Sequence, residues 1–225
     1  MATLSSQTEI LECRECPRLV AYREKIGREK VRRFRDQEYW GRPVPSLGNR
    51  NAKLLIVGLA PAAHGGNRTG RVFTGDRSGN WLFRAMHRFG FANQPTSVDR
   101  NDGLKLIDCY VTAAVHCAPP DNKPLPEEFA NCRRYLLDEL QQLKKVTVVV
   151  PLGLIGFKNY FAARKELGWE NPSPLPDFGH AATSKLSDGV NVICSYHPSQ
   201  QNTQTGKLTE AMLDNVFRRA RSLLT

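Results

Sequence analysis

Two kinds of apolar pattern alternate along the chain. Short runs rich in branched apolar residues are typical of buried strands, and they lie at residues 53–57, 106–114, 146–150 and 190–195. Longer segments with apolar residues on one face are typical of helices, and they lie at residues 80–89, 127–143, 154–167 and 209–223. Because strands and helices alternate, the pattern predicts an α/β fold with a parallel sheet covered by helices on both faces.

The remaining segments have weaker patterns. Residues 4–35 predict basic helical structure, whereas residues 36–52 and 171–187 read as irregular because proline, glycine and polar residues interrupt them. A length of 225 residues fits a single domain, which we place at residues 1–225 with the basic helical segment at its start.

Charge and hydropathy narrow the class of protein. The chain has 32 Lys and Arg against 22 Asp and Glu, a net charge of +10, which suits a polyanionic partner such as DNA or RNA. A generally basic protein without such a partner explains the charge equally well. No apolar run is long enough for a membrane span, and the first residues lack the pattern of a secretory signal, so we expect a cytoplasmic protein that contacts no membrane.

Three loops that follow predicted strands have an unusual composition, at residues 58–79, 115–126 and 196–206. In open α/β sheets, ligands bind where the carboxyl ends of the strands meet such loops. The first loop is rich in glycine but matches neither of the common nucleotide-binding patterns. Within it, Phe73 suits stacking on a planar base or packing into the core, and Asp76 suits a site or the N-cap of the next helix.

The other two loops supply further polar candidates. Asn122 follows a proline pair, and it is a candidate site residue or an ordinary turn residue. A lone histidine is more often structural than catalytic, but His197 stands at the end of the last predicted strand, a position that raises the odds of a functional role. The residues after it are uncharged donors suited to phosphates and base edges: Ser199, Gln200, Gln201 and Asn202.

The chain has six cysteines, which in a cytosolic protein indicate metal ligands or core thiols rather than disulfides. Cys109 and Cys194 fall in predicted strands and are most simply buried thiols. The other four are candidates for one four-thiolate site: Cys13, Cys16, Cys117 and Cys132. Zinc and an iron–sulfur cluster both use four thiolates, so ligand type alone leaves both open, along with no metal at all.

Three long motifs occur in order: GLAPAAHGGNRTGRVFTGDRSG at 58–79, CAPPDNKP at 117–124 and HPSQQNTQTG at 197–206. Together they resemble the uracil-DNA glycosylase superfamily, most closely its family 5, also called type B, over nearly the whole chain. The resemblance implies a three-layer α/β/α sandwich with a central, mainly parallel, four-stranded sheet. It also implies a structural [4Fe–4S] cluster held by Cys13, Cys16, Cys117 and Cys132.

The same resemblance implies a reaction and its residues. The chain is expected to hydrolyse the N-glycosidic bond of uracil in DNA after flipping the nucleotide out of the stack, and to leave an abasic site without cutting the strand. Asp76, Asn122 and His197 are then the catalytic candidates, while Gly58, Ala60 and Phe73 bind the base. The segment from Ser199 to Asn202, with Gln200 and Gln201, contacts the DNA.

Two positions depart from the related family 4. That family has an acidic residue where this chain has Leu59, and an asparagine where it has Ala113. Losing both polar groups is expected to loosen base selection toward hypoxanthine and xanthine. The expected partner is therefore DNA that contains deaminated bases. The protein itself is expected to be a monomer associated with the nucleoid.

Two other classes of function fit the sequence less well. A non-catalytic nucleic-acid-binding protein with a structural four-cysteine zinc site would show divergence in the three loops, which here match the family throughout. A nuclease requires clustered carboxylates for magnesium, and the motif loops supply only Asp76 and Asp121.

Overall fold

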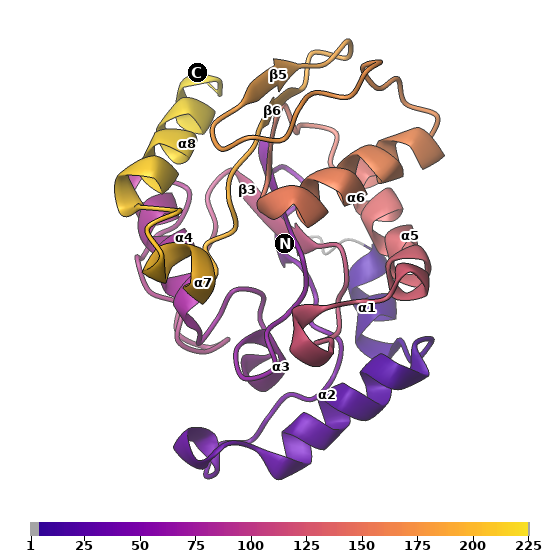
Figure 1. Cartoon of the computed structure of the whole chain (residues 1–225), viewed down its shortest axis with the longest axis vertical. Helices are drawn as coiled ribbons and strands as arrows, with labels where there is room; N and C mark the ends of the chain where they lie inside the picture. The colour runs from indigo at the N-terminus through magenta and orange to yellow at the C-terminus, as the bar shows by residue number, and fades with distance from the viewer. Residues whose placement is uncertain (1–4, 225) are drawn as a thin grey trace.

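The computed structural model describes residues 5–224, and these form a sheet between two layers of helices (Figure 1). The sheet has the strand order β1-β3-β2-β4-β6-β5. Its four inner strands run parallel: β2 (Leu54–Gly58), β3 (Cys109–Ala113), β4 (Val148–Pro151) and β6 (Asn191–Ile193). The predicted α/β sandwich with a mainly parallel sheet is confirmed.

The sheet also has two short edge strands that the sequence did not predict. β1 (Leu47–Gly48) pairs antiparallel with β3, and β5 (Thr183–Lys185) pairs antiparallel with β6. The predicted count of four strands therefore rises to six. Both edge strands lie in segments read as irregular, because two or three half-exposed residues carry no apolar run and are defined only by their pairing.

Alternate residues of the central strands face two separate apolar cores. Leu54 and Ile56 face the core beneath α4 (Arg77–Arg88) and α8 (Glu210–Ser222), while Leu55 and Val57 face the core beneath α5 and α6. α5 spans Pro126–Gln142 and α6 spans Gly153–Glu166. Figure 1 shows these helix pairs on opposite sides of the strands. Because both faces are covered, the inner strands are mostly apolar and hold their carboxyl ends rigidly.

The basic N-terminal segment forms two helices rather than one. α1 (Ser5–Glu12) and α2 (Pro17–Glu29) are separated by a short turn that holds Cys13 and Cys16, and a 3-10 turn follows at Arg32–Phe34. Pro17 starts α2, where its lack of an N–H group costs nothing. The predicted helical segment at 4–35 is thus broken, and its first residue lies outside the described ones.

Three further short helical segments lie in the loops. α3 (Gly66–Thr69) falls inside the glycine-rich loop, a 3-10 turn covers Pro120–Asn122, and α7 (Gln200–Gln204) follows the last strand. The four predicted helices agree with α4, α5, α6 and α8 to within a few residues. No helix among residues 5–224 is long and apolar enough to cross a membrane.

Candidate active site and cysteine cluster

The three motif loops meet at the carboxyl ends of the parallel strands and enclose a cleft of about 410 Å³. Most of the candidate site residues line this cleft together: Ala60, Phe73, Asp76, Asn122, His197, Ser199 and Gln200. They come from the loops after β2, β3 and β6, as the topology of the sheet requires. The cleft thus combines an aromatic ring, a carboxylate, an amide and an imidazole.

The Phe73 ring forms one wall of the cleft. Its backbone has φ 49°, a conformation that a phenylalanine adopts only when its surroundings impose it. A buried network imposes it here: Arg71 bonds Thr74 at 2.9 Å and forms an ion pair with Asp102 at 2.8 Å. Burial opposes ionisation of Asp102, yet its hydrogen bonds from Arg71 and backbone amides prevail and lower its pKa to about 2.

Gly58 lies beneath the Phe73 ring rather than on the cleft wall. A Cβ atom at Gly58 would lie 2.8 Å from the ring carbon Cζ of Phe73, so only glycine permits this packing. The ring also lies beside His197, with ring centroids 5.9 Å apart and planes tilted by 33°. A flat face is therefore held next to the histidine.

Asp76 combines a structural role with a place in the cleft. Its Oδ1 accepts a hydrogen bond from the Gly79 amide at 2.8 Å, which makes Asp76 the N-cap of α4. Its Oδ2 lies over Gly65, where any Cβ atom would collide with the carboxylate. Burial raises the pKa of Asp76, while the amides of Gly79 and Ser78 and the charge of Arg68 oppose that rise. Asp76 therefore lies both at the N-cap of α4 and in the candidate site, the two roles that the sequence left open.

His197 is neutral across the physiological pH range. Burial lowers its pKa to about 4, because a charged imidazolium would lose its water shell in the cleft. The loop that carries it is held by Asn202, whose Nδ2 donates to the His197 carbonyl oxygen at 2.9 Å. Ser199 caps α7 by accepting from the Asn202 amide at 3.3 Å. Ser199 and Asn202 thus fix the loop from within.

The remaining candidates, Asn122, Gln200 and Gln201, are exposed to solvent. Asn122 and its neighbour Asp121 both have positive φ, at 56° and 53°, which turns the loop after β3 back toward the cleft. The side-chain amide of Asn122 makes no hydrogen bond to any other part of residues 5–224 and is free for a ligand. Gln200 and Gln201 are exposed on α7, and Gln201 does not line the cleft.

Leu59 and Ala113, the two departures from family 4, both line the cleft wall, in keeping with the effect on base selection expected of them. Other residues at the cleft were not predicted from the sequence. Arg77 lines its mouth and donates to Thr203 at 3.1 Å, which connects the first loop to α7. Arg68 donates to the Gly75 carbonyl oxygen at 2.9 Å and so holds the turn before Asp76. Three arginines within the glycine-rich loop at 58–79 were the available signal for such internal bracing.

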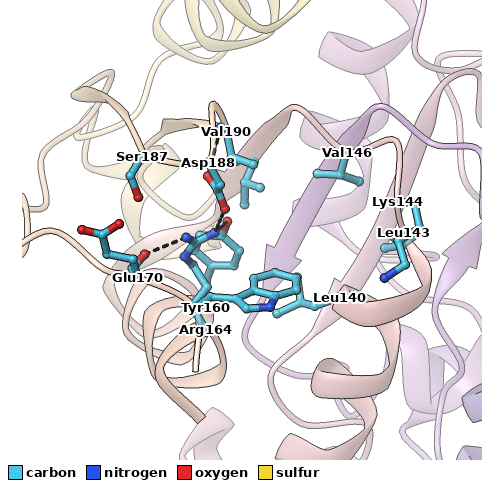
Figure 2. A pocket seen from close by; sticks show the side chains of 12 residues that line it. Leu140, Leu143, Lys144, Val146, Tyr160, Arg164, Glu170, Ser187, Asp188 and Val190 are labelled. Carbon is cyan, nitrogen blue, oxygen red and sulfur yellow. Dashed lines mark hydrogen bonds and ion pairs between the residues drawn. The ribbon is translucent and has the colours of Figure 1, made fainter. Parts of the chain in front are cut away.

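Another hollow, of about 490 Å³, lies at the opposite end of the sheet. It is formed where β4 and β6 begin, and Arg164 crosses it to pair with Asp188 at 2.7 Å (Figure 2). The guanidinium is buried, and it also bonds the Glu170 carbonyl oxygen at 2.8 Å (Figure 2). None of the predicted site residues lines this hollow, and the arginine in it is already fully bonded.

The four candidate cysteine ligands meet below the cleft. They come from the α1–α2 turn, the loop after β3 and α5, and they pack with Ile10 and Leu19 around one small enclosed pocket. The thiol of Cys132 has its pKa raised by burial and then by the charges of the other three, which places all four within electrostatic range. The other two cysteines, Cys109 and Cys194, are buried in the sheet cores as predicted.

Each of these four sulfurs accepts a hydrogen bond from a nitrogen. Arg23 donates to Cys117 at 2.9 Å and the His116 amide donates to Cys132 at 3.3 Å. Asn131 donates to Cys16 at 3.5 Å and Arg134 to Cys13 at 3.9 Å. Such donors stabilise negative charge on sulfur, so the surroundings of these four sulfurs suit thiolates. In residues 5–224, no three His, Cys, Asp or Glu side chains already stand in the arrangement that a bound metal ion imposes.

Comparison with known proteins agrees with the site. Residues 45–221 match the model of the uracil DNA glycosylase superfamily. The chain is 50% identical to a type-5 uracil-DNA glycosylase of Mycobacterium bovis over 94% of this chain and 78% of the relative. It is 49% identical to one of Mycobacterium leprae, over 96% and 93%, and 47% identical to one of Thermus thermophilus, over 94% and 93%.

Proposed function

The chain belongs to the uracil-DNA glycosylase superfamily and within it to the type-5 enzymes, and we propose that it hydrolyses the N-glycosidic bond of uracil in DNA. One observation carries the proposal beyond family membership. Phe73, Asp76, Asn122 and His197 line a single cleft at the carboxyl ends of the parallel strands. These side chains supply a stacking face, a carboxylate, an amide and a neutral imidazole, which are the groups the reaction requires.

The target nucleotide enters this cleft only after it leaves the base stack. A cleft of about 410 Å³ that is walled by the loops after three strands has no room for a duplex, so we infer that the enzyme flips the nucleotide out. The basic protein surface attracts the DNA phosphates. Gln200 and Gln201 are exposed on α7 and contact the DNA strand in this proposal. Phe73 then stacks on the extruded base.

Cleavage of the glycosidic bond develops negative charge on the base and positive charge on the sugar. His197 stabilises the departing base as a hydrogen-bond donor, because its lowered pKa keeps it neutral and gives it one N–H at physiological pH. Backbone amides at Leu59 and Ala60, which line the cleft, assist at the carbonyl oxygens of the base. Asp76 stabilises the sugar cation or orients the attacking water, and the unbonded amide of Asn122 holds that water.

Base selection is proposed to extend to hypoxanthine and xanthine. The cleft wall has Leu59 and Ala113 where the related type-4 enzymes carry polar groups that read uracil. Without those groups, the wall neither bonds uracil specifically nor leaves a buried polar atom unpaired when a purine enters. Phe73 stacks on either ring system.

Four thiolates are proposed to hold a [4Fe–4S] cluster. Cys13, Cys16, Cys117 and Cys132 would be its ligands, and the N–H donors on all four sulfurs fit its negative charge. The cluster when bound supplies cross-links rather than reaction chemistry. It would join the α1–α2 turn to α5 and to the loop that carries Asn122.

The protein is proposed to be a monofunctional enzyme and a monomer on deaminated DNA. Lys123 is the one lysine within the three motifs, and no lysine of residues 5–224 lines the cleft, so this part of the chain places no side-chain amine to attack the sugar. The test is incubation with duplexes that hold one uracil, hypoxanthine or xanthine, with chromatography of the released base and borohydride trapping. We expect free base and no trapped adduct. A trapped adduct contradicts monofunctional chemistry, and no released base from any duplex contradicts the glycosylase proposal.

A further inference from the structure

Arg23 carries a buried guanidinium group that has no carboxylate partner. The residue lies in α2 and is 2% exposed. By contrast, the guanidinium of Arg164, which is as deeply buried, forms an ion pair with an aspartate. No Asp or Glu side chain of residues 5–224 forms an ion pair with Arg23, and the neighbouring Glu24 pairs with Arg14 at 2.7 Å instead. Because burial of an unpaired charge is costly, the counter-charge of Arg23 has to come from another kind of group.

The hydrogen bonds of this guanidinium lead to the cysteine cluster. Nη1 of Arg23 donates to the sulfur of Cys117 at 2.9 Å, and Nη2 donates to the carbonyl oxygen of Cys13 at 3.2 Å. Nε has no hydrogen-bond partner in the described part of the chain. A guanidinium keeps its proton in a protein, so its positive charge is permanent. Of the groups that it bonds within residues 5–224, only the Cys117 sulfur can carry a full negative charge.

Metal ligation supplies negative charge at this place. Four neutral thiols would leave the guanidinium uncompensated, whereas cysteines bind a metal as thiolates. A [4Fe–4S] core with four thiolates is negatively charged overall, and a cation beside its sulfurs stabilises that charge. The unpaired arginine and the four cysteines therefore fit each other as counter-charges.

The same arginine connects α2 to the first motif loop. Its backbone carbonyl oxygen accepts a hydrogen bond at 3.2 Å from Nδ2 of Asn67, which is fully buried in α3. The backbone amide of Asn67 donates to the carbonyl oxygen of Ala62 at 3.1 Å, and Ala62 lines the cleft. Figure 1 shows α2 beside α3. Arg23 thus lies between a proposed metal ligand, Cys117, and a helix that borders the cleft.

We propose that Arg23 is the buried counterion of the four-thiolate centre, and that the centre holds α2 against the first motif loop through this residue. The inference rests on the cluster proposed above. It gives Arg23 a positioning role rather than a catalytic one. Retention of the metal then depends on the charge of one side chain outside the ligand set.

The first test measures how fast iron is released. Wild-type protein, Arg23→Lys, Arg23→Gln and Arg23→Met are mixed with an excess of a ferrous-iron chelator, and the visible absorbance is followed. Lysine keeps the charge, whereas glutamine keeps an N–H donor without the charge. Release is expected to be about tenfold faster for the glutamine and methionine variants and within about threefold of the wild type for lysine. Wild-type release from Arg23→Gln, or equally fast release from the lysine and methionine variants, would overturn the proposal.

A second arginine provides a matched control. Arg134 also donates to a sulfur of the cluster, that of Cys13 at 3.9 Å, but its side chain is 48% exposed and pairs with Glu15. Solvent and the carboxylate screen this charge, so release from Arg134→Met is expected to stay within about threefold of the wild type. If Arg134→Met loses iron as fast as Arg23→Met does, burial of an unpaired charge is not the cause.

The second test compares melting temperatures with and without the metal centre. Arg23→Met is expected to lower the melting temperature of the wild type. In Cys132→Ala, which lacks one ligand, the guanidinium has no counter-charge, so adding Arg23→Met is expected to leave the melting temperature unchanged or to raise it. Thermal unfolding followed by circular dichroism measures all four proteins. An equal fall in both backgrounds would show that Arg23 stabilises the fold independently of the metal.

Hydrogen exchange tests the connection to the first motif loop. Amide exchange in residues 62–69 is expected to be faster in Arg23→Met than in the wild type and unchanged in Arg134→Met. Wild-type exchange there in Arg23→Met would contradict the connection.

Metal analysis of the wild type separates this inference from those on which it rests. Wild-type protein purified without iron contradicts the cluster and the counterion together. Iron in the wild type, with undiminished retention in Arg23→Gln and Arg23→Met, contradicts the counterion alone. Uracil excision by the wild type tests the glycosylase proposal separately, because iron release is measured without DNA.

Discussion

Asp76 shows how one side chain combines a structural role with a place in the candidate site. One carboxylate oxygen caps α4 through the Gly79 amide, and the other lies in the cleft above Gly65. The sequence pattern predicted both positions separately, because an aspartate before a helix caps it and an aspartate in this motif serves a site. Only the structure shows that the two oxygens divide these roles.

Substitutions at Asp76 are predicted to separate the two roles. Asparagine caps a helix as well as aspartate does, so Asp76→Asn is expected to keep the melting temperature while its kcat falls about a hundredfold. Asp76→Ala is expected to lose the same activity and also about 1 kcal/mol of stability, because the cap is gone. Thermal unfolding and single-turnover excision measure the two effects. Near-normal activity of Asp76→Asn would contradict a catalytic role for the charge.

The acid side of the activity profile is predicted to reflect the same carboxyl group. Burial raises the pKa of Asp76, so its proton is bound at a higher pH than that of an ordinary aspartate. Since the ionised form is proposed to stabilise the sugar cation or orient water, activity should fall on acidification before free aspartates are protonated. A profile of kcat against pH measures this, and Asp76→Asn should lack that limb.

Phe73 is predicted to bind the base through its ring face. Phe73→Ala is expected to lower kcat/KM by about tenfold to a hundredfold, the usual contribution of a stacked aromatic, while Phe73→Tyr retains most activity because the face remains. Steady-state kinetics on a uracil duplex provide the measurement. Equal activity of the alanine and tyrosine variants would mean that the ring does not stack on the base.

At the residue scale, the motifs predicted which side chains would meet but not how they are held. The positive φ of Phe73, Asp121 and Asn122 follows from surrounding contacts, which a linear sequence does not record. The bracing of the first loop by Arg71 and Asp102 was missed for the same reason, since these residues are far apart along the chain.

At the scale of elements, long periodic segments were predicted and short ones were not. The four inner strands and four main helices carry enough apolar residues to define them locally. β1, β5 and α7 are so short that pairing, or a single cap, decides their conformation. The break between α1 and α2 at Cys13 and Cys16 was likewise hidden, because both flanking segments are helical in pattern.

A buried network joins α1, β3 and α5 around the Glu139 carboxyl group. Its Oε1 accepts hydrogen bonds from Ser46 at 2.5 Å and Tyr110 at 2.9 Å, and Gln7 of α1 donates to it at 3.4 Å. Burial outweighs these bonds and raises the pKa of Glu139 from 4.5 to about 7. The folded protein therefore binds this proton more tightly than the unfolded chain does.

The network is predicted to make stability depend on pH. Since the folded state prefers protonated Glu139, its contribution to the free energy of unfolding is full below pH 4.5 and is lost as the pH rises to about 7. The free energy of unfolding is measured with denaturant for the wild type and for Glu139→Gln. The difference between the two proteins should change by about 3 kcal/mol between pH 4.5 and pH 7. A difference that does not change with pH would show that Glu139 is ionised in the folded protein.

At the scale of the whole molecule, charge and cysteine content indicated a class but not a mechanism. The net charge of +10 is compatible with many kinds of nucleic-acid-binding protein and so indicates no particular reaction. The four scattered cysteines gained meaning only when the fold brought the α1–α2 turn, the loop after β3 and α5 together. The predicted strands already set Cys109 and Cys194 apart as core thiols, and the structure buries both in the sheet cores.

The cysteine cluster is predicted to hold iron and to stabilise the N-terminal helices. Cys132→Ala is expected to purify without iron and visible cluster absorbance, and with a lower melting temperature, because a cross-link between α5 and the α1–α2 turn is lost. Cys109→Ala, a buried thiol of β3 outside the cluster, should keep its iron. Zinc in place of iron, or iron retained by Cys132→Ala, would contradict the assignment.

The most direct test of the account is excision of uracil from a labelled duplex by the wild-type protein and by His197→Ala. After incubation, hot alkali cleaves any abasic site, and a denaturing gel separates the fragments. We predict alkali-dependent cleavage at the uracil for the wild type, a loss of about a hundredfold or more for His197→Ala, and no cleavage without alkali. No alkali-dependent cleavage by wild-type protein that retains its metal, or full activity of His197→Ala, would contradict the account.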